Sequence, residues 1–270
     1  MLNSTTIGII GGGQMGEALI RGIIQSGLLA AEKIMVIDPD RERCDLLNKK
    51  YSVLIAEDKK ILAATSSVLI LGVKPQVMGN VLDAYRQYLT DSHLLISIAA
   101  GVTIEAIEKG LGKKVKIVRV MPNTPALVLA GASALSPNSM ATREDVEIAV
   151  RIFSAVGTCQ EIEEKLLDAV TGLSGSGPGY VFAFIEAMID GGVLAGLPRT
   201  VAEKLVLQTV YGAAKMAIET GEPPAVLKGR VTSPGGTTIT GLQVLEESGF
   251  HGTIMAAVEA ATKRSKELGQ

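Results

Sequence analysis

The stretch IGIIGGGQMG, residues 7–16, decides the fold of the N-terminal half of the chain. Its first four residues, Ile7–Ile10, form an apolar run of the kind found in short buried strands. An amphipathic pattern follows from Gln14 to Ser26 and predicts a helix. The glycines between the two elements have the spacing GxGxxG. This order of strand, glycine-rich turn and helix predicts the first unit of a parallel α/β sheet.

The glycine-rich turn also predicts a ligand. The first glycine permits a tight turn, the second lets a pyrophosphate approach the backbone, and the third lets the helix pack closely on the strand. The helix N-terminus offers free N–H groups and a positive dipole end to the phosphates. The predicted cofactor-binding residues of this turn are Gly11, Gly13, Gln14, Met15 and Gly16. We therefore expect a Rossmann fold and a nicotinamide dinucleotide.

The second apolar run, Ile34–Ile37, is followed by Asp38, about 20 residues after the last glycine of the turn. A carboxylate at this place accepts a hydrogen bond from the ribose 2′-hydroxyl and favours NADH. A nearby arginine favours the 2′-phosphate of NADPH instead, and Arg41 and Arg43 are both close in sequence. The two arginines fit equally well as a solvated first helical turn. Asp38 and Arg41 are thus both candidates for cofactor binding, and NADH and NADPH both remain open, with a lean to NADH.

The two halves of the chain differ in their patterns. Residues 1–163 alternate short apolar runs with amphipathic segments, which predicts a mainly parallel, doubly wound sheet with helices on both faces. The further predicted strands are Val68–Leu71, Leu94–Ile98 and Val115–Val120, and the further predicted helices are Arg41–Lys49, Gln76–Tyr88 and Ile104–Lys109. Residues 164–270 show no strand and form a predicted all-α domain. Its helices are Pro178–Ala195, Thr200–Glu219, Thr237–Ser248 and Thr253–Leu268.

The helix predicted at Pro178–Ala195 is apolar on all sides. Such a helix has to be buried on all sides. A domain of this size can hardly bury several such helices alone, so we expect a subunit interface here. A helical core within a single chain is the alternative.

Three segments follow predicted strands at the edge where α/β sheets bind their ligands. They are Val73-Lys74-Pro75, Ala99-Ala100-Gly101 and Met121-Pro122-Asn123-Thr124-Pro125. Prolines stiffen the first and third segments, and the small residues of the second leave room for a flat ring. A plain rigid connector is the alternative interpretation.

Two polar segments stand out in the helical half. The segments 171–179 and 233–238 combine glycines and hydroxyls directly before predicted helices. Such helix starts bind small anions through N–H groups and side-chain hydroxyls. The alternative for each is an N-capped flexible turn.

Composition argues against several function classes. The chain has 26 basic and 28 acidic residues and a formal net charge of −2, so its charge gives no reason to expect nucleic acid or a membrane as a partner. The two cysteines lie in no Cys/His cluster, so we expect no metal, no disulfide framework and, without a signal peptide, a cytoplasmic location. We interpret both histidines, His93 and His251, as exposed structural residues.

Six motifs together resemble the pyrroline-5-carboxylate reductase family over essentially the whole chain. They are GGGQMG at 11–16, VKPQ at 73–76, AAGVTI at 99–104, MPNTP at 121–125, TGLSGSGPGY at 171–180 and VTSPGGTTITGLQVLEESGF at 231–250. The resemblance implies reduction of L-1-pyrroline-5-carboxylate to L-proline by NADPH or NADH, the last step of proline biosynthesis. It also implies a homodimer held together by interlocking C-terminal helices, with decamers common in the family.

The resemblance also implies roles for single residues. Thr238 would be the catalytic residue and would donate a hydrogen bond to the ring nitrogen, while the helix start at Ser233 holds the substrate carboxylate. The implied substrate-binding residues are Asn123, Ser174, Gly175, Ser176, Gly177, Ser233, Gly236, Thr237 and Thr238. The implied cofactor-lining residues beyond the glycine-rich turn are Val73, Lys74, Pro75 and Ala100. A protonated C=N substrate needs a hydride and a donor to its nitrogen, and no strong base.

One departure from the family concerns Asp38-Pro39-Asp40-Arg41, since many members have small hydroxyl or amide residues after the second strand. It leaves the reaction unchanged and the cofactor preference open. A 3-hydroxyacid dehydrogenase is the alternative enzyme class, but it requires a lysine on the helix Pro178–Ala195, which has none. A non-catalytic nucleotide sensor is the other alternative, and it would have no use for the polar segments of the helical half.

Overall fold

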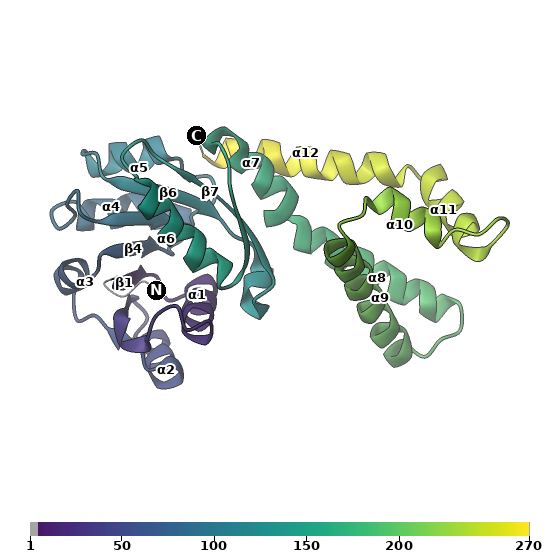
Figure 1. The fold of residues 1–270 in the computed structure, drawn as a ribbon, viewed down its shortest axis with the longest axis horizontal. Helices are drawn as coiled ribbons and strands as arrows, with labels where there is room; N and C mark the ends of the chain where they lie inside the picture. The colour runs from purple at the N-terminus through teal and green to yellow at the C-terminus, as the bar shows by residue number, and fades with distance from the viewer. Residues whose placement is uncertain (1–4, 270) are drawn as a thin grey trace. The chain divides into compact units, whose positions relative to one another are not determined.

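The computed structural model describes residues 5–269, and Figure 1 shows their fold. Of the described residues, one compact unit holds 5–176 and 259–269. The other compact unit holds Gly177–Val258. The division into domains 1–163 and 164–270 stays a prediction.

An eight-stranded sheet forms the middle of the first unit, in the order β3-β2-β1-β4-β5-β6-β7-β8. All neighbouring strands are parallel except β6 and β7, which are antiparallel. The strands are β1 (Ile7–Ile10), β2 (Ile34–Ile37), β3 (Leu54–Ile55), β4 (Val68–Leu71), β5 (Leu94–Ser97), β6 (Lys116–Met121), β7 (Gly131–Pro137) and β8 (Gly157–Glu161). The predicted mainly parallel sheet is confirmed.

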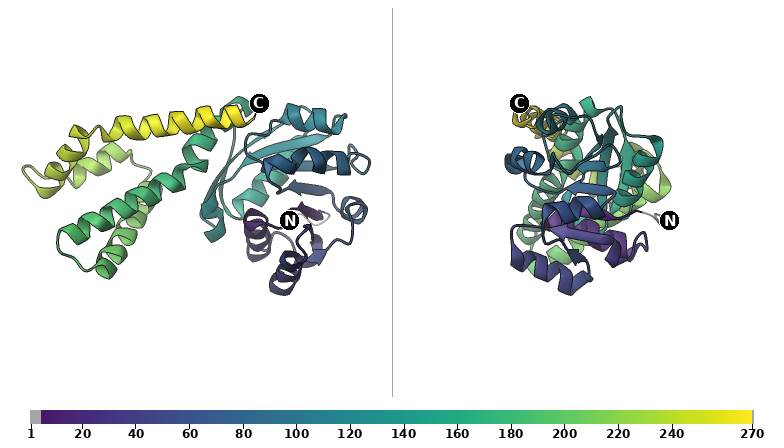
Figure 2. Two further views of the ribbon diagram at one scale, coloured as in Figure 1. Left: turned by 180° about the vertical axis from the view of Figure 1, so that it is seen from behind. Right: turned by 90° about the vertical axis from the view of Figure 1, so that its left-hand side faces the viewer.

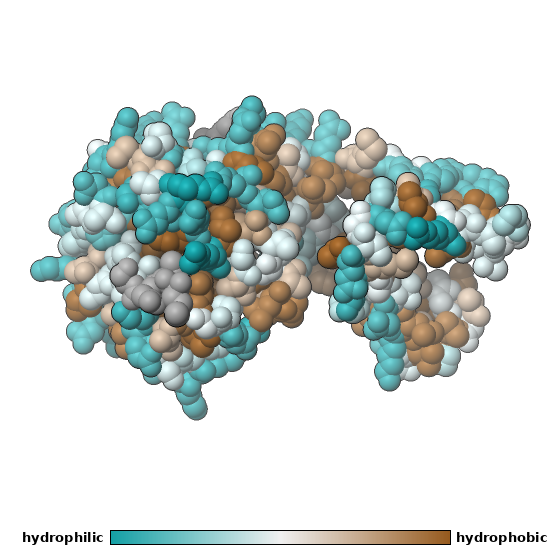
Figure 3. Space-filling model, viewed as in Figure 1, coloured by the Kyte–Doolittle hydropathy of each residue, from teal (hydrophilic) through white to brown (hydrophobic). Residues whose placement is uncertain are grey.

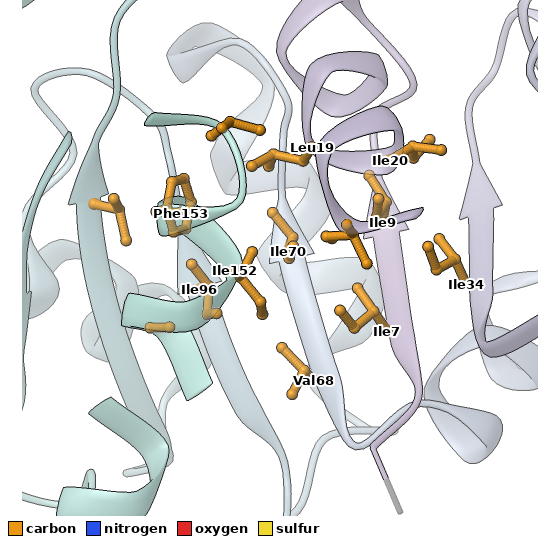
Figure 4. Packing of buried hydrophobic residues seen from close by; sticks show 14 of the residues in the cluster. Ile7, Ile9, Leu19, Ile20, Ile34, Val68, Ile70, Ile96, Ile152 and Phe153 are labelled. Atoms are coloured by element: carbon orange, nitrogen blue, oxygen red, sulfur yellow. The ribbon is translucent and has the colours of Figure 1, made fainter. Parts of the chain in front are cut away.

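Helices cover both faces of this sheet, because the strand residues alternate between two apolar clusters. Ile7, Ile9 and Ile70 face the cluster that also contains Leu19 of α1 and Phe153 of α6 (Figure 4). The neighbouring strand residues face a second cluster, which is covered by α3, α4 and α5. The helices of this unit are α1 (Gln14–Gln25), α2 (Arg41–Tyr51), α3 (Lys59–Thr65), α4 (Met78–Tyr85), α5 (Ile104–Leu111), α6 (Arg143–Ser154) and α7 (Leu167–Val170).

Three strands, β3, β7 and β8, extend the sheet beyond the predicted set, and β7 and β8 lie together at one edge. β7 reads GASALSP and β8 reads GTCQE, and neither has the apolar run that marks β1 or β4. They form because β7 pairs with β6 on one side and β8 pairs with β7 on the other. Tertiary pairing outweighs weak local strand preference here.

The second unit is entirely helical. Its helices are α8 (Gly177–Leu194), α9 (Arg199–Thr220), α10 (Pro224–Arg230), α11 (Thr237–Glu247) and the first part of α12 (Phe250–Leu268). α8 and α9 lie side by side as an antiparallel pair (Figure 2). The predicted all-α character of this half is confirmed.

The helical unit leaves apolar side chains at its surface (Figure 3). No residue of α8 is buried, although the helix is rich in Val, Phe, Ile and Met. Phe182 is 65% exposed and Val181 is 44% exposed. Apolar helix surfaces of this extent are typical of a protein interface. Among the described residues, no helix is both long enough and apolar enough to cross a bilayer.

Candidate active site

The glycine-rich turn joins β1 to α1 with no space for a side chain at two positions. Gly11 has a φ of +100°, and a Cβ there would lie 2.7 Å from the carbonyl oxygen of Gly72. A Cβ on Gly16 would lie 2.6 Å from the carbonyl oxygen of Gly11. Gly13 differs, because it is the N-cap of α1 and nothing lies within 4 Å of a Cβ built on it. No side chain caps this helix start. Open space beside uncapped helical N–H groups fits a pyrophosphate.

A cavity of about 920 Å³ adjoins this turn. It brings together Gly11, Asp38, Arg41 and Val73, four of the predicted cofactor-binding residues. The sequence analysis missed the residues that α3, α4, the 3-10 turn Pro75–Val77 and the loop after β3 add to the lining. They include Glu57, Lys59, Val77, Asn80, Val81, Ala84 and Tyr85. No local motif marks them, because only the strand order brings these segments beside β1.

The remaining predicted cofactor residues lie at the exits of neighbouring strands. Lys74 is exposed and precedes a single 3-10 turn that starts at Pro75, after β4. Ala100 is exposed after β5. Because β1, β4 and β5 are adjacent and parallel, their carboxyl ends share one edge of the sheet with the glycine-rich turn.

The carboxylate of Asp38 is bound to the backbone of the site. Its Oδ2 accepts a hydrogen bond from the N–H of Gly12 at 2.7 Å, and its Oδ1 accepts one from the N–H of Asp40 at 2.9 Å. Arg43 does not pair with it. The Arg43 guanidinium donates to the carbonyl oxygen of Gly12 and to the carboxylate of Glu17. Arg43 is therefore held by other groups and is not a free partner for a 2′-phosphate.

Glu17 joins α1, which carries the glycine-rich turn, to α2. Its carboxylate accepts hydrogen bonds from Lys50 and Tyr51, both at 2.9 Å, as well as from Arg43. Burial alone would raise the pKa of Glu17, but these three hydrogen bonds outweigh burial and lower the pKa to about 2. The ionised carboxylate thus fixes the helix start of α1 against α2.

Asn123, at the exit of β6, uses both ends of its side-chain amide. Its Nδ2 donates to the carbonyl oxygen of Ser174 at 3.0 Å, and its Oδ1 accepts from the N–H of Ala132 at 2.8 Å. Residue 178 is a proline without an N–H, so the usual α-helical bond to the Ser174 carbonyl cannot form. Asn123 supplies the missing donor.

The polar segment 171–179 is not a turn before a helix, and this prediction is wrong. Thr171–Gly175 form one π-helical turn, and Ser176 continues with helical backbone angles into α8. The N–H of Ser176 donates to the carbonyl oxygen of Thr171 at 2.8 Å, which is the i→i+5 bond of a π-helix. The helix thus runs on from α7, and no free helix start exists here to bind an anion. π-helical turns of this kind are frequent at functional sites.

The second polar segment does form a helix start. Gly236 is the N-cap of α11, and no side chain caps it. Ser233 lies so close that a Cβ on Gly236 would be 2.2 Å from the Ser233 Oγ. Thr237 and Thr238 are the first two residues of the helix. The structure therefore places uncapped N–H groups and the hydroxyls of this segment together at one helix start.

The two histidines differ from each other. His93 is buried, so the prediction that it is exposed is wrong. Its Nδ1 accepts a hydrogen bond from the N–H of Thr90, and its Nε2 donates one to the carbonyl oxygen of Ala63. The residue is buried because β5 begins directly after it, next to the interior of the sheet. His251 is exposed and pairs with Glu246 at 2.9 Å. Across residues 5–269, no three His, Cys, Asp or Glu side chains gather to hold a metal ion.

A Rossmann sheet with an open phosphate cradle and a separate helical unit define a class of protein. They are the parts of a two-unit, dinucleotide-dependent oxidoreductase.

Comparisons with known proteins narrow this class to one family. Residues 164–268 match the family model for pyrroline-5-carboxylate reductase dimerisation. Residues 6–101 match the model described as NADP oxidoreductase, coenzyme F420-dependent. Curated pyrroline-5-carboxylate reductases from Synechocystis sp. and Escherichia coli are 50% and 42% identical to the chain, over 99% and 98% of its length and the same shares of their own.

Solved structures agree with the sequence relatives. A pyrroline-5-carboxylate reductase from Coxiella burnetii has a TM-score of 0.95 at 37% identity, with 99% of this chain and 100% of that chain covered. The Plasmodium falciparum pyrroline carboxylate reductase with NADP bound has a TM-score of 0.88 at 38% identity, with 98% of each chain covered. The chain belongs to the pyrroline-5-carboxylate reductase family. The resemblance expected from the six motifs is confirmed.

Proposed function

We propose that this chain reduces L-1-pyrroline-5-carboxylate to L-proline with NADH or NADPH, the last step of proline biosynthesis. The observation that carries the proposal is the full-length match to reductases of this name, at up to 50% identity. The match includes both units, so the cradle for the dinucleotide and the helix start at Gly236 are present in one chain.

The first unit would hold the cofactor along the carboxyl edge of its sheet. The N–H groups at the start of α1 bind the pyrophosphate, and Gly11 and Gly16 keep the strand and helix close enough to form this cradle. Lys74, Pro75 and Ala100, at the exits of β4 and β5, orient the nicotinamide end. When bound, the dihydronicotinamide supplies the hydride that adds to the imine carbon.

The start of α11 would hold the substrate. Its uncapped N–H groups and the Ser233 hydroxyl bind the carboxylate, and the helix dipole favours that negative charge. The Thr238 hydroxyl donates a hydrogen bond to the lone pair that the ring nitrogen gains as hydride adds to the protonated imine. Because the imine enters protonated, the chain supplies positioning rather than a base. Asn123 and the residues of the π-helical turn are further proposed substrate-binding residues.

The helical units would associate as a homodimer. α8, α11 and α12 enclose an apolar groove of about 630 Å³, lined by residues such as Tyr180, Phe184, Met188, Leu245 and Phe250. The same helices of a second copy would fit against this groove, since the groove and the surface of those helices are both apolar. The proposal also includes further assembly into decamers and a cytoplasmic location. It includes no nucleic acid and no membrane as a partner.

The oxidation of a 3-hydroxyacid by a 3-hydroxyacid dehydrogenase is the rival reaction. It requires a lysine on the first long helix of the second unit, and α8 contains none. The purified protein is incubated with pyrroline-5-carboxylate and reduced cofactor, and the loss of reduced-cofactor absorbance is followed with L-proline identified as product. Parallel reactions contain a 3-hydroxyacid and the oxidised cofactor. Turnover of the hydroxyacid alone, or of neither substrate, would overturn the proposal.

A further inference from the structure

We infer that this chain selects NADH over NADPH through the fixed carboxylate of Asp38. The inference rests on the proposed function and deepens it, because it names the cofactor that the site accepts. Asp38 follows β2 directly and lies in the wall of the cavity beside the glycine-rich turn.

The Asp38 side chain cannot turn away from an incoming ribose. Its two oxygens accept hydrogen bonds from the N–H groups of Gly12 and Asp40, at 2.7 and 2.9 Å. Gly12 belongs to the turn that holds the pyrophosphate, so the same backbone that positions the phosphates also positions the carboxylate. Rotating the carboxylate would leave both N–H groups without their acceptor.

The negative charge of Asp38 is not neutralised by a neighbour. In the part of the chain that the structure describes, no basic side chain lies within 4.0 Å of its carboxylate. Arg43, one of the two candidate arginines on α2, is held by the Glu17 carboxylate and by the Gly12 carbonyl oxygen. Releasing Arg43 for a 2′-phosphate would break one of the three hydrogen bonds that join Glu17 of α1 to α2.

A fixed carboxylate treats the two cofactors differently. A carboxylate can accept about four hydrogen bonds, and two of these positions are taken by the backbone. The remaining positions can accept the 2′-hydroxyl of NADH. The 2′-phosphate of NADPH has only acceptor oxygens and carries close to two negative charges. The Asp38 carboxylate therefore repels it and offers it no hydrogen-bond donor.

The other charges of the cavity do not reverse this preference. Arg41, the exposed first residue of α2, and Lys59 are the basic lining residues. Asp38, Asp45 and Glu57 are the acidic lining residues. Carboxylates thus outnumber cations, and the one carboxylate held in place is the one next to the glycine-rich turn.

The experiment measures dissociation constants for NADH and NADPH by titration calorimetry, together with kcat/KM for each cofactor. We expect the unmodified protein to bind NADH at least about tenfold more tightly than NADPH, the size of one charge-assisted hydrogen bond. Asp38→Asn keeps an acceptor for one backbone N–H and removes the charge. It should lower the NADH preference by about tenfold or more. Thermal unfolding checks that the variant is folded.

Asp45→Asn is the matched control, because Asp45 lines the same cavity, is exposed and makes no ion pair within the described residues. It removes the same charge and should change the preference less than about twofold. An unmodified protein that binds NADPH as tightly as NADH overturns the inference, and this measurement needs no variant. Equal shifts in Asp38→Asn and Asp45→Asn also overturn it. A protein that prefers NADH in the calorimeter but reduces no pyrroline-5-carboxylate would overturn the proposed function alone.

Discussion

Asn123 donates its side-chain amide to the carbonyl oxygen of Ser174 at 3.0 Å, across 51 positions of the chain. This bond connects the exit of β6 to the π-helical turn that precedes α8. It occupies the carbonyl oxygen that Pro178 cannot satisfy. The same side chain accepts from the N–H of Ala132 at the start of β7, so one residue ties the exit of β6 to both the π-helical turn and the start of β7.

Asn123→Asp should lower both stability and activity. The substituted carboxylate cannot donate, and its charge faces the Ser174 carbonyl oxygen. The free energy of unfolding should fall by about 1–3 kcal/mol, the usual penalty for a part-buried polar group left without its partner. Urea unfolding measures this loss, and kcat/KM should fall because the π-helical turn is no longer held.

Asn48→Asp is the control for this variant. Asn48 donates to the carbonyl oxygen of Val53 at 2.8 Å and lies outside the lining of the cofactor cavity. We expect a comparable loss of stability and a kcat/KM within about twofold of the unmodified protein. Equal activity losses in the two variants would show that Asn123 acts through stability alone.

The strands with continuous apolar runs were predictable because their signal is local. All four residues of β4, Val68–Leu71, are buried, as expected for a strand covered on both faces. β7 carries no such signal, since Gly131–Pro137 is built mainly from small residues. It becomes a strand through pairing with β6, and pairing between distant segments cannot be seen in a single run of residues.

The functional site, like the sheet, has parts that local sequence predicts and parts that depend on contacts between distant segments. The glycine-rich turn was predictable because each glycine has a steric role within a few residues of sequence. The segment 171–177 misled the prediction, because glycine and serine locally favour turns. Its helical state depends on i→i+5 bonds and on Asn123, which lies far away in sequence. The engagement of Arg43 by Glu17 is likewise tertiary, so sequence alone left Arg43 open as a phosphate partner.

Glu17→Gln should destabilise the protein near neutral pH and lose this effect in acid. The folded state lowers the pKa of Glu17 from 4.5 to about 2, because its hydrogen bonds to Lys50, Arg43 and Tyr51 outweigh burial. A carboxyl group with a lowered pKa stabilises the fold above its unfolded pKa and loses that contribution as pH falls through the folded pKa. At pH 7 we expect a loss of roughly 1–3 kcal/mol in the variant. The difference should shrink between pH 4.5 and about 2.

Urea unfolding at a series of pH values measures this difference. Glu42→Gln is the control, since Glu42 is exposed in the first turn of α2 and has no ion pair among the described residues. Its effect should stay within about 0.5 kcal/mol at every pH. A Glu17→Gln loss that does not depend on pH would contradict the role of the ionised carboxylate.

Phe182→Glu should dissociate the proposed homodimer. Phe182 lies on α8 and is 65% exposed in the single chain, so only a partner can bury it. Placing a carboxylate in an apolar interface costs several kcal/mol unless it is paired. Light scattering should show a smaller particle than the unmodified protein gives. Leu46→Glu, on α2 of the other unit and 46% exposed, should leave the mass unchanged. An unchanged mass for Phe182→Glu would place the interface elsewhere.

Thr238→Ala should lower kcat by about 10- to 100-fold, because the lost hydrogen bond to the ring nitrogen stabilises the transition state by roughly 1.5–3 kcal/mol. Thr238 is the second residue of α11, in the helical turn whose uncapped N–H groups are proposed to hold the substrate carboxylate. Thr238→Ser keeps the donor and should restore most of the rate.

Thr240→Ala is the matched control on the same helix, since the Thr240 hydroxyl already donates to the carbonyl oxygen of Gly236 at 3.1 Å. Steady-state kinetics should show the loss in kcat with the KM for reduced cofactor unchanged. If Thr238→Ala keeps the full rate, the donor to the nitrogen is another group, and Thr238 serves only to begin the helix.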